Sequence, residues 1–126
     1  MTGKILVVDD SKLSRRTLRR ILETAGFSVI EAEDGMSALE LYFLERPDAV
    51  LLDLVMTGMY GLEVLDKIRE IDANARVLIA SADIQSSTRQ LAEQGGAAAV
   101  INKPLVAEDV LDALQKVLAG GHVLGT

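Results

Sequence analysis

The sequence predicts an α/β fold, a doubly wound parallel sheet with helices on both faces. Short β-rich runs alternate with amphipathic, helix-period runs along the whole chain. Three of the short runs are apolar throughout, which is typical of strands that are covered on both faces. The length of 126 residues suits one domain. A (βα)5 alternation in a chain of this length indicates a five-stranded parallel sheet with right-handed crossovers.

The expected strands lie at residues 5–8, 28–31, 49–52, 77–80 and 98–101. The first, third and fourth of these are the runs that are apolar throughout. The commonest order for such a sheet is the flavodoxin-like order 2-1-3-4-5, in which ligands bind at the carboxyl ends of the first and third strands. We expect one domain over residues 1–120 and a flexible, glycine-rich tail over residues 121–126.

Five helices are expected around these strands. Ser11 and Asp34 are suitable N-caps for the first two helices, and Gly26 ends the first. The fourth helix, 86–94, has only Leu91 as a large apolar residue, so we expect it to be held most weakly. The expected apolar faces of the others are Leu18, Ile21, Leu22 and Ala25; Ala38, Leu39, Tyr42 and Phe43; Val64, Leu65, Ile68 and Ile71; and Val110, Leu111, Leu114, Val117 and Leu118.

Composition and charge exclude several classes of function. The formal net charge of −6 opposes direct binding to nucleic acid. The chain has no cysteine, which removes disulfides and thiol chemistry. No stretch approaches the length of a membrane span, and the N-terminal apolar run is too short for a signal peptide. We therefore expect a cytoplasmic protein that has no membrane partner.

Polar residues break the apolar pattern at the ends of the expected strands. They are Asp9 and Asp10 after the first strand, Asp53 after the third, Ser81 after the fourth and Lys103 after the fifth. The fold brings the carboxyl ends of these strands to one edge of the sheet. Each of these residue types is common in turns or on surfaces, but their joint placement predicts a single site.

Three carboxylates in one small pocket repel one another unless a cation compensates for them. A hard divalent ion that accepts a few carboxylates, water and phosphate oxygens fits this requirement, and we expect Mg²⁺, with Mn²⁺ as a substitute. Asp10 and Asp53 are the best direct ligands, with Asp9 acting through water. The backbone carbonyl of Val55 is the candidate for a further ligand.

A carboxylate can attack phosphorus and form an acyl phosphate. Phosphoryl transfer needs positioning and charge neutralisation more than covalent help from the protein. Asp53 is the expected nucleophile, while Lys103 and the Ser81 hydroxyl would each bind a phosphoryl oxygen. A cis peptide bond at Pro104 would turn Lys103 toward this site.

With these residues in place, the sequence resembles the receiver domains of bacterial two-component response regulators, and the single-domain chemotaxis regulators among them. The resemblance covers essentially the whole chain, and its set of motifs in this order is highly specific. The motifs are ILVVDDS over 5–11, EDGMSAL over 33–39, PDAVLLDLVMTGMYG over 47–61, VLIASA over 77–82 and NKP over 102–104.

The resemblance implies that Asp53 is phosphorylated and that Asp9 and Asp10 form the acidic pair that binds magnesium. Ser81 would fill the hydroxyl position of the family and Lys103 its lysine position. The donor would be a phosphohistidine on a sensor histidine kinase or a histidine phosphotransfer protein, since the only histidine here is His122 in the tail. A downstream protein target would read the phosphorylated state, so the chain would be a signalling phosphoacceptor and not an enzyme.

The sequence departs from the family pattern at a few positions. Thr57 replaces a frequent proline, and Val100 replaces an aromatic residue that swings inward when the hydroxyl moves. The expected switch region therefore comprises Ser81, Val100 and Pro104, without an aromatic side chain. Val55 and Asp83 flank the site at positions that the resemblance links to the lifetime of the phosphoryl group.

Two surfaces are candidates for protein contacts. The expected output surface consists of the fourth helix, the fifth strand and the fifth helix, because the fourth helix is weakly packed. The first helix carries Arg15, Arg16, Arg19 and Arg20 opposite its apolar face. These arginines form either a solvated cationic face or a docking patch for an acidic, histidine-bearing helix bundle.

Two other functions stay open at this point. A magnesium-dependent phosphatase of the haloacid-dehalogenase type uses the same residue types on an α/β sheet. Its nucleophile follows the first strand with a second Asp two residues later, and here Ser11 takes that place after Asp9. The other alternative is a receiver-like module that binds partners without phosphorylation, which would not need the complete five-residue site.

Overall fold

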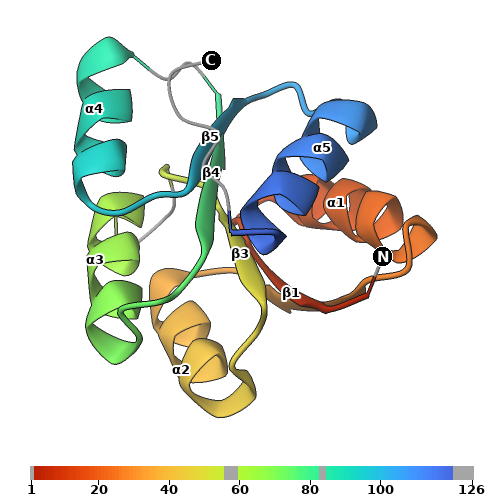
Figure 1. Ribbon diagram of the computed structural model, residues 1–126, viewed down its shortest axis with the longest axis horizontal. Coiled ribbons are helices and arrows are strands. Elements are labelled where there is room, and N and C mark those ends of the chain that lie inside the picture. Colours follow the sequence, from red (N-terminus) through yellow and green to blue (C-terminus); the bar gives the residue numbers. More distant parts are fainter. Residues whose placement is uncertain (1, 56–59, 83–84, 121–126) are drawn as a thin grey trace.

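The computed structural model describes residues 2–55, 60–82 and 85–120. Within these residues, strands and helices alternate in the predicted (βα)5 order (Figure 1). The strands are β1 Lys4–Val8, β2 Ser28–Ala32, β3 Ala49–Leu52, β4 Val77–Ser81 and β5 Ala99–Asn102. The helices are α1 Lys12–Thr24, α2 Gly35–Glu45, α3 Gly61–Ile71, α4 Ser86–Gln94 and α5 Ala107–Leu118. No helix in this part of the chain is both long enough and apolar enough to cross a bilayer.

The five strands form one parallel sheet in the order β2-β1-β3-β4-β5, which confirms the prediction. β1, β3 and β4 are the inner strands and are almost completely buried, whereas β2 and β5 form the edges. In the register of β1 and β3, Val8 lies beside Leu52. Because both strands end at this pair, the residues that follow them, Asp9 and Asp53, emerge side by side.

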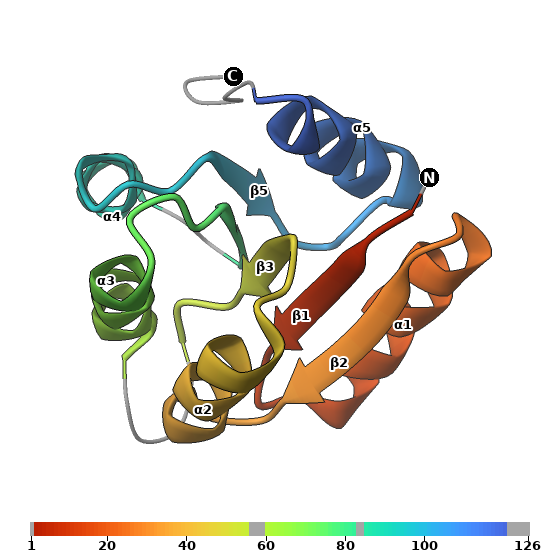
Figure 2. The ribbon, with the colours of Figure 1, turned by 60° about the horizontal axis from the view of Figure 1, so that its bottom comes forward.

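Helices cover both faces of the sheet (Figures 1 and 2). α2, α3 and α4 pack on one face, around a cluster that includes Leu52, Leu65 and Ile79. α1 and α5 pack on the other face, around a cluster that includes Ile5, Leu22 and Leu114. The two clusters hold the strands between them. The carboxyl ends of the strands, which carry the polar residues, are therefore rigidly supported.

The predicted helix ends are confirmed. Ser11 and Asp34 cap α1 and α2, and each side chain accepts a hydrogen bond from a backbone N–H three residues later, at 3.2 and 2.8 Å. Gly26 follows α1 with a φ of +101°, a value that glycine adopts without steric cost. The N–H of Phe27 then donates to the carbonyl of Leu22 at 3.0 Å, which is the bond expected of a Schellman motif.

Some details of the sequence prediction were wrong. Several strands begin or end one residue away from the predicted bounds, which is the usual uncertainty at element ends. Phe43 is 62% exposed, because it lies one residue, or about 100°, round the helix from the buried Tyr42. Leu91 is 54% exposed, and Ala92 is the buried residue of α4. α4 is thus held through a smaller side chain than expected.

Candidate functional site

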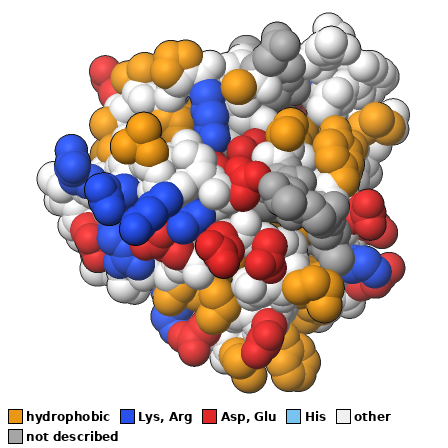
Figure 3. Space-filling view, turned by 180° about the vertical axis from the view of Figure 1, so that it is seen from behind, with side chains coloured by type: hydrophobic (Ala, Val, Ile, Leu, Met, Phe, Trp, Pro, Cys, Tyr) orange, Lys and Arg blue, Asp and Glu red, His pale blue; other side chains and the backbone are white. Residues whose placement is uncertain are grey.

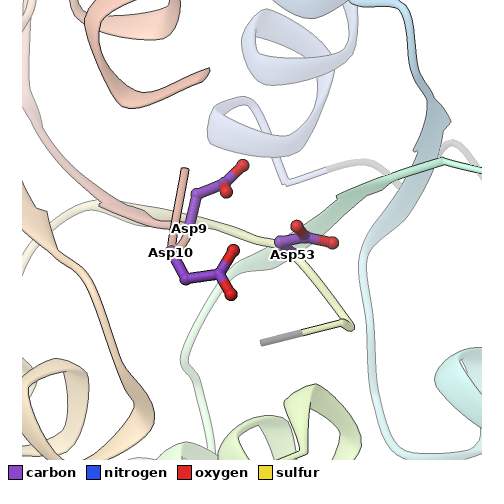
Figure 4. A group of neighbouring side chains, drawn as sticks. All are labelled: Asp9, Asp10 and Asp53. Atoms are coloured by element: carbon purple, nitrogen blue, oxygen red, sulfur yellow. The ribbon is translucent and has the colours of Figure 1, made fainter. Parts of the chain in front are cut away.

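The ends of β1 and β3 bring three carboxylates together (Figure 4). One carboxylate oxygen from each of Asp9, Asp10 and Asp53 lies within 4.8 Å of the others. Asp9 and Asp53 are buried, whereas Asp10 is exposed at the mouth of the cluster. The predicted convergence of these residues at one edge of the sheet is therefore present in the structure.

Asp53 is held by the backbone and by two polar side chains. Its N–H donates to the carbonyl of Val8 at 2.9 Å, which continues the ladder between β3 and β1. Its Oδ1 accepts hydrogen bonds from the Ser81 hydroxyl at 2.6 Å and from the N–H of Val55 at 3.2 Å. Its Oδ2 lies 3.4 Å from the ammonium nitrogen of Lys103. The Asp53 side chain is only 10% exposed, and these contacts fix the orientation of its carboxylate.

Lys103 links Asp53 to Asp9. Its ammonium nitrogen donates to Oδ2 of Asp9 at 2.7 Å and lies 3.4 Å from the hydroxyl of Ser14. Burial by itself lowers the pKa of Lys103, but the hydrogen bond to Asp9 and the charges of Asp53 and Asp9 outweigh it and raise this pKa above its ordinary value. The ammonium group is therefore a fixed positive charge within the acidic cluster.

The two other strand ends supply the neutral and cationic groups of the site. Ser81 ends β4 and is buried, and its carbonyl accepts a hydrogen bond from the N–H of Lys103 at 3.0 Å. This bond joins the end of β4 to the segment after β5. The Lys103–Pro104 peptide bond is cis. All five polar residues predicted at the strand ends thus lie in one connected group.

Comparison with known proteins identifies the family. The sequence-family model of the response regulator receiver domain matches residues 5–115 of the chain. The chain belongs to this family. The receiver is 42% identical over 119 residues to the chemotaxis protein CheY of Bacillus subtilis, covering 94% of this chain and 99% of that one. It is 36% identical to the sporulation initiation phosphotransferase F of the same organism, covering 94% and 95% of the two chains.

Solved structures of receiver domains have the same fold. A chemotaxis protein of Vibrio cholerae, CheY4, superposes with a TM-score of 0.87 at 29% identity, covering 93% of this chain and 99% of that one. A two-component response regulator of the LuxR family from Aurantimonas reaches 0.93 at 32% identity, covering 98% and 90%. The protein is a receiver domain of phosphorelay signalling, a signalling phosphoacceptor of the CheY type, and nothing in these comparisons supports a phosphatase or an unphosphorylated binding module.

The receiver uses one residue near the site whose role sequence reasoning missed. Gly61 begins α3, and its N–H donates to the carbonyl of Leu54 at 3.0 Å. A Cβ atom on Gly61 would lie 2.4 Å from the Cα of Leu54 and 2.7 Å from the carbonyl oxygen of Asp53. Only glycine allows α3 to begin this close to the backbone that carries Asp53. The one signal in the sequence was its place at the end of the motif over 47–61.

The remaining predicted residues surround this group. Val55 is exposed and its N–H contacts Asp53, while Pro104 is exposed beside Lys103. Val100 is 7% exposed within β5 and belongs to the core that also includes Ala92 of α4. Three residues discussed with the sequence, Thr57, Asp83 and His122, lie outside the described residues, as does the tail over 121–126.

The arginines of α1 do not form one uniform solvated row. Arg15 and Arg19 both pair with Glu31 on β2, at 3.1 and 2.6 Å, whereas Arg16 and Arg20 are exposed. Burial alone raises the pKa of Glu31, but the hydrogen bonds and charges of Arg19 and Arg15 outweigh it and hold this pKa below its usual range. Figure 3 shows Lys and Arg side chains gathered on one side of the molecule with acidic side chains among them.

Proposed function

We propose that Asp53 accepts a phosphoryl group from a phosphohistidine on a partner protein. The observation that carries this proposal is the fixed position of its carboxylate, bonded at 2.6 Å to the Ser81 hydroxyl and 3.4 Å from the Lys103 ammonium group. A carboxylate oxygen of Asp53 attacks phosphorus, so that a P–O bond forms while the P–N bond breaks. The departing imidazole nitrogen keeps the electron pair of the broken bond.

Lys103 and Ser81 have the chemistry to stabilise the transferred group. Both already contact the carboxylate of Asp53, so a phosphoryl group attached to that carboxylate arrives within their reach. The ammonium group neutralises negative charge on a phosphoryl oxygen, and the hydroxyl donates a hydrogen bond to another. The N–H of Val55, at 3.2 Å from Asp53, is a further donor on the same side.

The acidic cluster fits a hard divalent cation. Its donors are carboxylate oxygens, which Mg²⁺ prefers, and the ammonium group of Lys103 contacts two of the three carboxylates, those of Asp9 and Asp53. We propose that Asp9, Asp10, Asp53 and the backbone carbonyl of Val55 hold Mg²⁺, or Mn²⁺ in its place. When bound, the ion supplies charge neutralisation for the phosphoryl oxygens. The chain's own residues orient the acceptor and keep its surroundings partly shielded from water.

The donor is proposed to be a sensor histidine kinase or a histidine phosphotransfer protein that docks beside the site. Arg15, Arg16 and Arg19 were the candidate docking residues, and of these Arg16 is exposed. Replacing Arg16 by Glu should lower the rate of transfer from a protein donor at low salt and leave transfer from acetyl phosphate unchanged. Equal rates from the protein donor before and after this change would count against docking on α1. We retain the expected cytoplasmic location as part of this proposal.

The proposed output surface is formed by α4, β5 and α5. α4 is attached through Ala92, and Val100 of β5 lies in the same core. Beside it, Arg89, Val100 and Asp109 line a pocket of about 280 Å³. The Nη1 atom of Arg89 is buried and has no hydrogen-bond partner among the described residues, and an unpaired buried donor costs about 1–3 kcal/mol. This combination of light packing and an unsatisfied group favours a second arrangement of α4 that phosphorylation can select.

Hydrogen exchange tests the output surface. On phosphorylation, amide protection should change in α4 and β5 and stay constant in α2, which lies on the same face of the sheet and serves as the internal control. Unchanged protection in α4 and β5 would refute this surface. A downstream protein target would bind it, and the receiver would act as a phosphoacceptor that assists only its own phosphoryl transfer and loss.

Intact mass spectrometry tests the acceptor. After incubation with Mg²⁺ and acetyl phosphate, the wild type should gain one phosphoryl group. The Asp53→Asn variant and a wild-type sample in EDTA should gain none. A phosphoryl adduct that survives in Asp53→Asn would place the nucleophile at Asp9 or Asp10. Failure of the wild type with several phosphodonors would overturn the proposal.

A further inference from the structure

Arg15 contacts two separate parts of the chain from its place in the first turn of α1. Its Nη1 donates to the backbone carbonyl of Asp9 at 2.7 Å, and its Nε donates to Oε1 of Glu31 on β2 at 3.1 Å. The side chain is only 13% exposed. The planar guanidinium group presents donors in fixed directions, so the two contacts constrain each other.

The peptide group that Arg15 contacts connects Asp9 to Asp10. Asp9 is held on its other side as well, because its N–H donates to the carbonyl of Ala32 at 3.1 Å. The peptide unit is planar, so a fixed carbonyl on Asp9 also fixes the nitrogen of Asp10 and the direction in which the chain enters that residue. Asp10 is the exposed member of the acidic cluster, and the Asp9–Asp10 peptide is its direct connection to the end of β1.

Glu31 provides a firm anchor for Arg15. It lies in β2 opposite Val7 of β1, so its backbone is part of the sheet. Its second carboxylate oxygen accepts a hydrogen bond from Nε of Arg19 at 2.6 Å, and Arg19 also donates to the carbonyl of Val29 at 3.2 Å. The position of the Asp9 carbonyl is thus tied through Arg15 to β2.

We infer that Arg15 is a positioning residue for the metal site, which acts by fixing the Asp9–Asp10 peptide through its contact with Glu31. Arg15 touches neither the phosphoryl acceptor nor a carboxylate of the cluster, and both of its contacts lie within the chain. This inference rests on the proposed function, since it assumes that Asp9 and Asp10 hold Mg²⁺. It also separates Arg15 from the exposed Arg16, which stays available to a partner.

The test is a titration with Mg²⁺ alone, without any phosphodonor, followed by NMR chemical shifts of the amides after β1 and β3. Arg15→Met removes the donors but keeps most of the stem, and should weaken Mg²⁺ binding by about ten-fold, as is typical when a partner of a metal ligand is lost. Arg15→Lys keeps the positive charge but loses the planar guanidinium donors, and its Mg²⁺ affinity should lie between those of Arg15→Met and the wild type. Arg16→Met is the matched control for the lost charge and should leave the affinity unchanged.

The outcomes separate the competing roles. If Arg15→Met lowers the unfolding midpoint but keeps the wild-type Mg²⁺ affinity, Arg15 is only a structural brace and the inference is wrong. If both are unchanged while transfer from a protein donor slows, Arg15 is a docking residue and the inference is also wrong. If the wild type itself fails to bind Mg²⁺, the proposed metal site fails, and the inference falls with it.

A second variant keeps the test decisive if Arg15→Met does not fold. Glu31→Gln removes the charged anchor and leaves Arg15 and its donors in place. It should weaken Mg²⁺ binding by less than Arg15→Met. The double variant Arg15→Met/Glu31→Gln should lose no more Mg²⁺ affinity than Arg15→Met alone, because both changes break the same connection between the Asp9 carbonyl and β2. An unchanged affinity in Glu31→Gln together with a fully additive double variant would contradict the inference.

Discussion

At the scale of single residues, the site is built from charged groups that fix one another. Lys103 contacts Asp9 at 2.7 Å and Asp53 at 3.4 Å, and Ser81 contacts Asp53 at 2.6 Å. Each of these contacts joins the ends of different strands. The geometry of the acceptor therefore depends on the positions of the strands and on the backbone immediately after β3.

Gly61 gives the first prediction. Gly61→Ala places a Cβ atom 2.4 Å from the Cα of Leu54, and backbone cannot yield as a side-chain end can. We expect the free energy of unfolding to fall by about 1–3 kcal/mol, the usual cost of overpacking, and phosphorylation by acetyl phosphate to slow. Urea denaturation and intact mass over time measure the two effects.

Gly95→Ala is the matched control for this change. Gly95 has an ordinary helical φ of −75°, and the nearest atom to its added Cβ is the end of the Leu65 side chain at 3.1 Å. This variant should phosphorylate at the wild-type rate. Equal phosphorylation rates for Gly61→Ala and the wild type would show that the backbone after Asp53 tolerates displacement.

The site was predictable from the sequence where residue type and topology were enough. Asp9, Asp53, Ser81 and Lys103 lie at the ends of strands, and parallel strands bring their ends together whatever the details of packing. The contact between Arg15 and the Asp9 carbonyl was not predictable, because it depends on how α1 lies against β2. The need for glycine at position 61 likewise follows from a close approach of two backbone segments, which residue type and strand topology do not reveal.

At the scale of elements, the hydrogen bond between α2 and the end of α3 shows how two helices on one face are tied. The Tyr42 hydroxyl donates to Oδ2 of Asp72 at 2.8 Å, and Asp72 is the residue that ends α3. Burial, followed by the hydrogen bond and charge of Asp72, raises the pKa of Tyr42. The hydrogen bonds from Tyr42 and from the N–H of Asn74 lower the pKa of Asp72.

The second prediction concerns the pH dependence of this pair. Because the pKa of Asp72 is lower in the folded state, its ionised form stabilises the fold above about pH 4. This stabilisation is lost as the pH falls through the pKa of Asp72 in the folded state. Because the pKa of Tyr42 is higher in the folded state, its neutral form stabilises the fold below about pH 10. This stabilisation is lost as the pH rises toward the pKa of Tyr42 in the folded state. Tyr42→Phe should therefore cost about 1–2 kcal/mol at pH 7, and less below pH 4 and above pH 10.

Urea denaturation of the wild type and of Tyr42→Phe measures the difference in their free energy of unfolding. Measurements at pH 3.5, 7 and 10.5 lie below, between and above the unperturbed pKa values of Asp and Tyr, about 4 and 10. Tyr60→Phe is the control, since Tyr60 is 43% exposed and its hydroxyl forms no hydrogen bond with the described part of the chain. A cost that stays constant across the three pH values would show that ionisation of the pair makes no contribution.

Elements were more predictable than the exposure of individual side chains within them. The alternation of apolar strands and amphipathic helices was sufficient to predict the strand order. The capping residues Ser11 and Asp34 were sufficient to predict where α1 and α2 begin. The exposure of Phe43 was missed because apolar periodicity does not tell which of two neighbouring residues faces the core. Its ring instead lies 5.7 Å from the guanidinium carbon of Arg46.

At the scale of the whole molecule, the receiver concentrates like charges at one end of its sheet. The formal net charge is −6, and Asp9, Asp10 and Asp53 crowd the ends of β1 and β3. Such a cluster is destabilising unless cations compensate for it, and Lys103 compensates only in part. A divalent cation that binds only the folded chain must then stabilise the fold.

The third prediction follows from this linkage. At a Mg²⁺ concentration about ten times the dissociation constant, binding should add about 1.4 kcal/mol to the free energy of unfolding. Thermal unfolding in MgCl₂, compared with NaCl of equal ionic strength, separates specific binding from general screening of the net charge. Asp10→Asn should lose most of the gain, because this change removes a proposed ligand without disturbing the contacts of Lys103 with Asp9 and Asp53. A gain of equal size in NaCl would mean that screening alone stabilises the fold. An undiminished gain in Asp10→Asn would mean that Asp10 does not hold the ion.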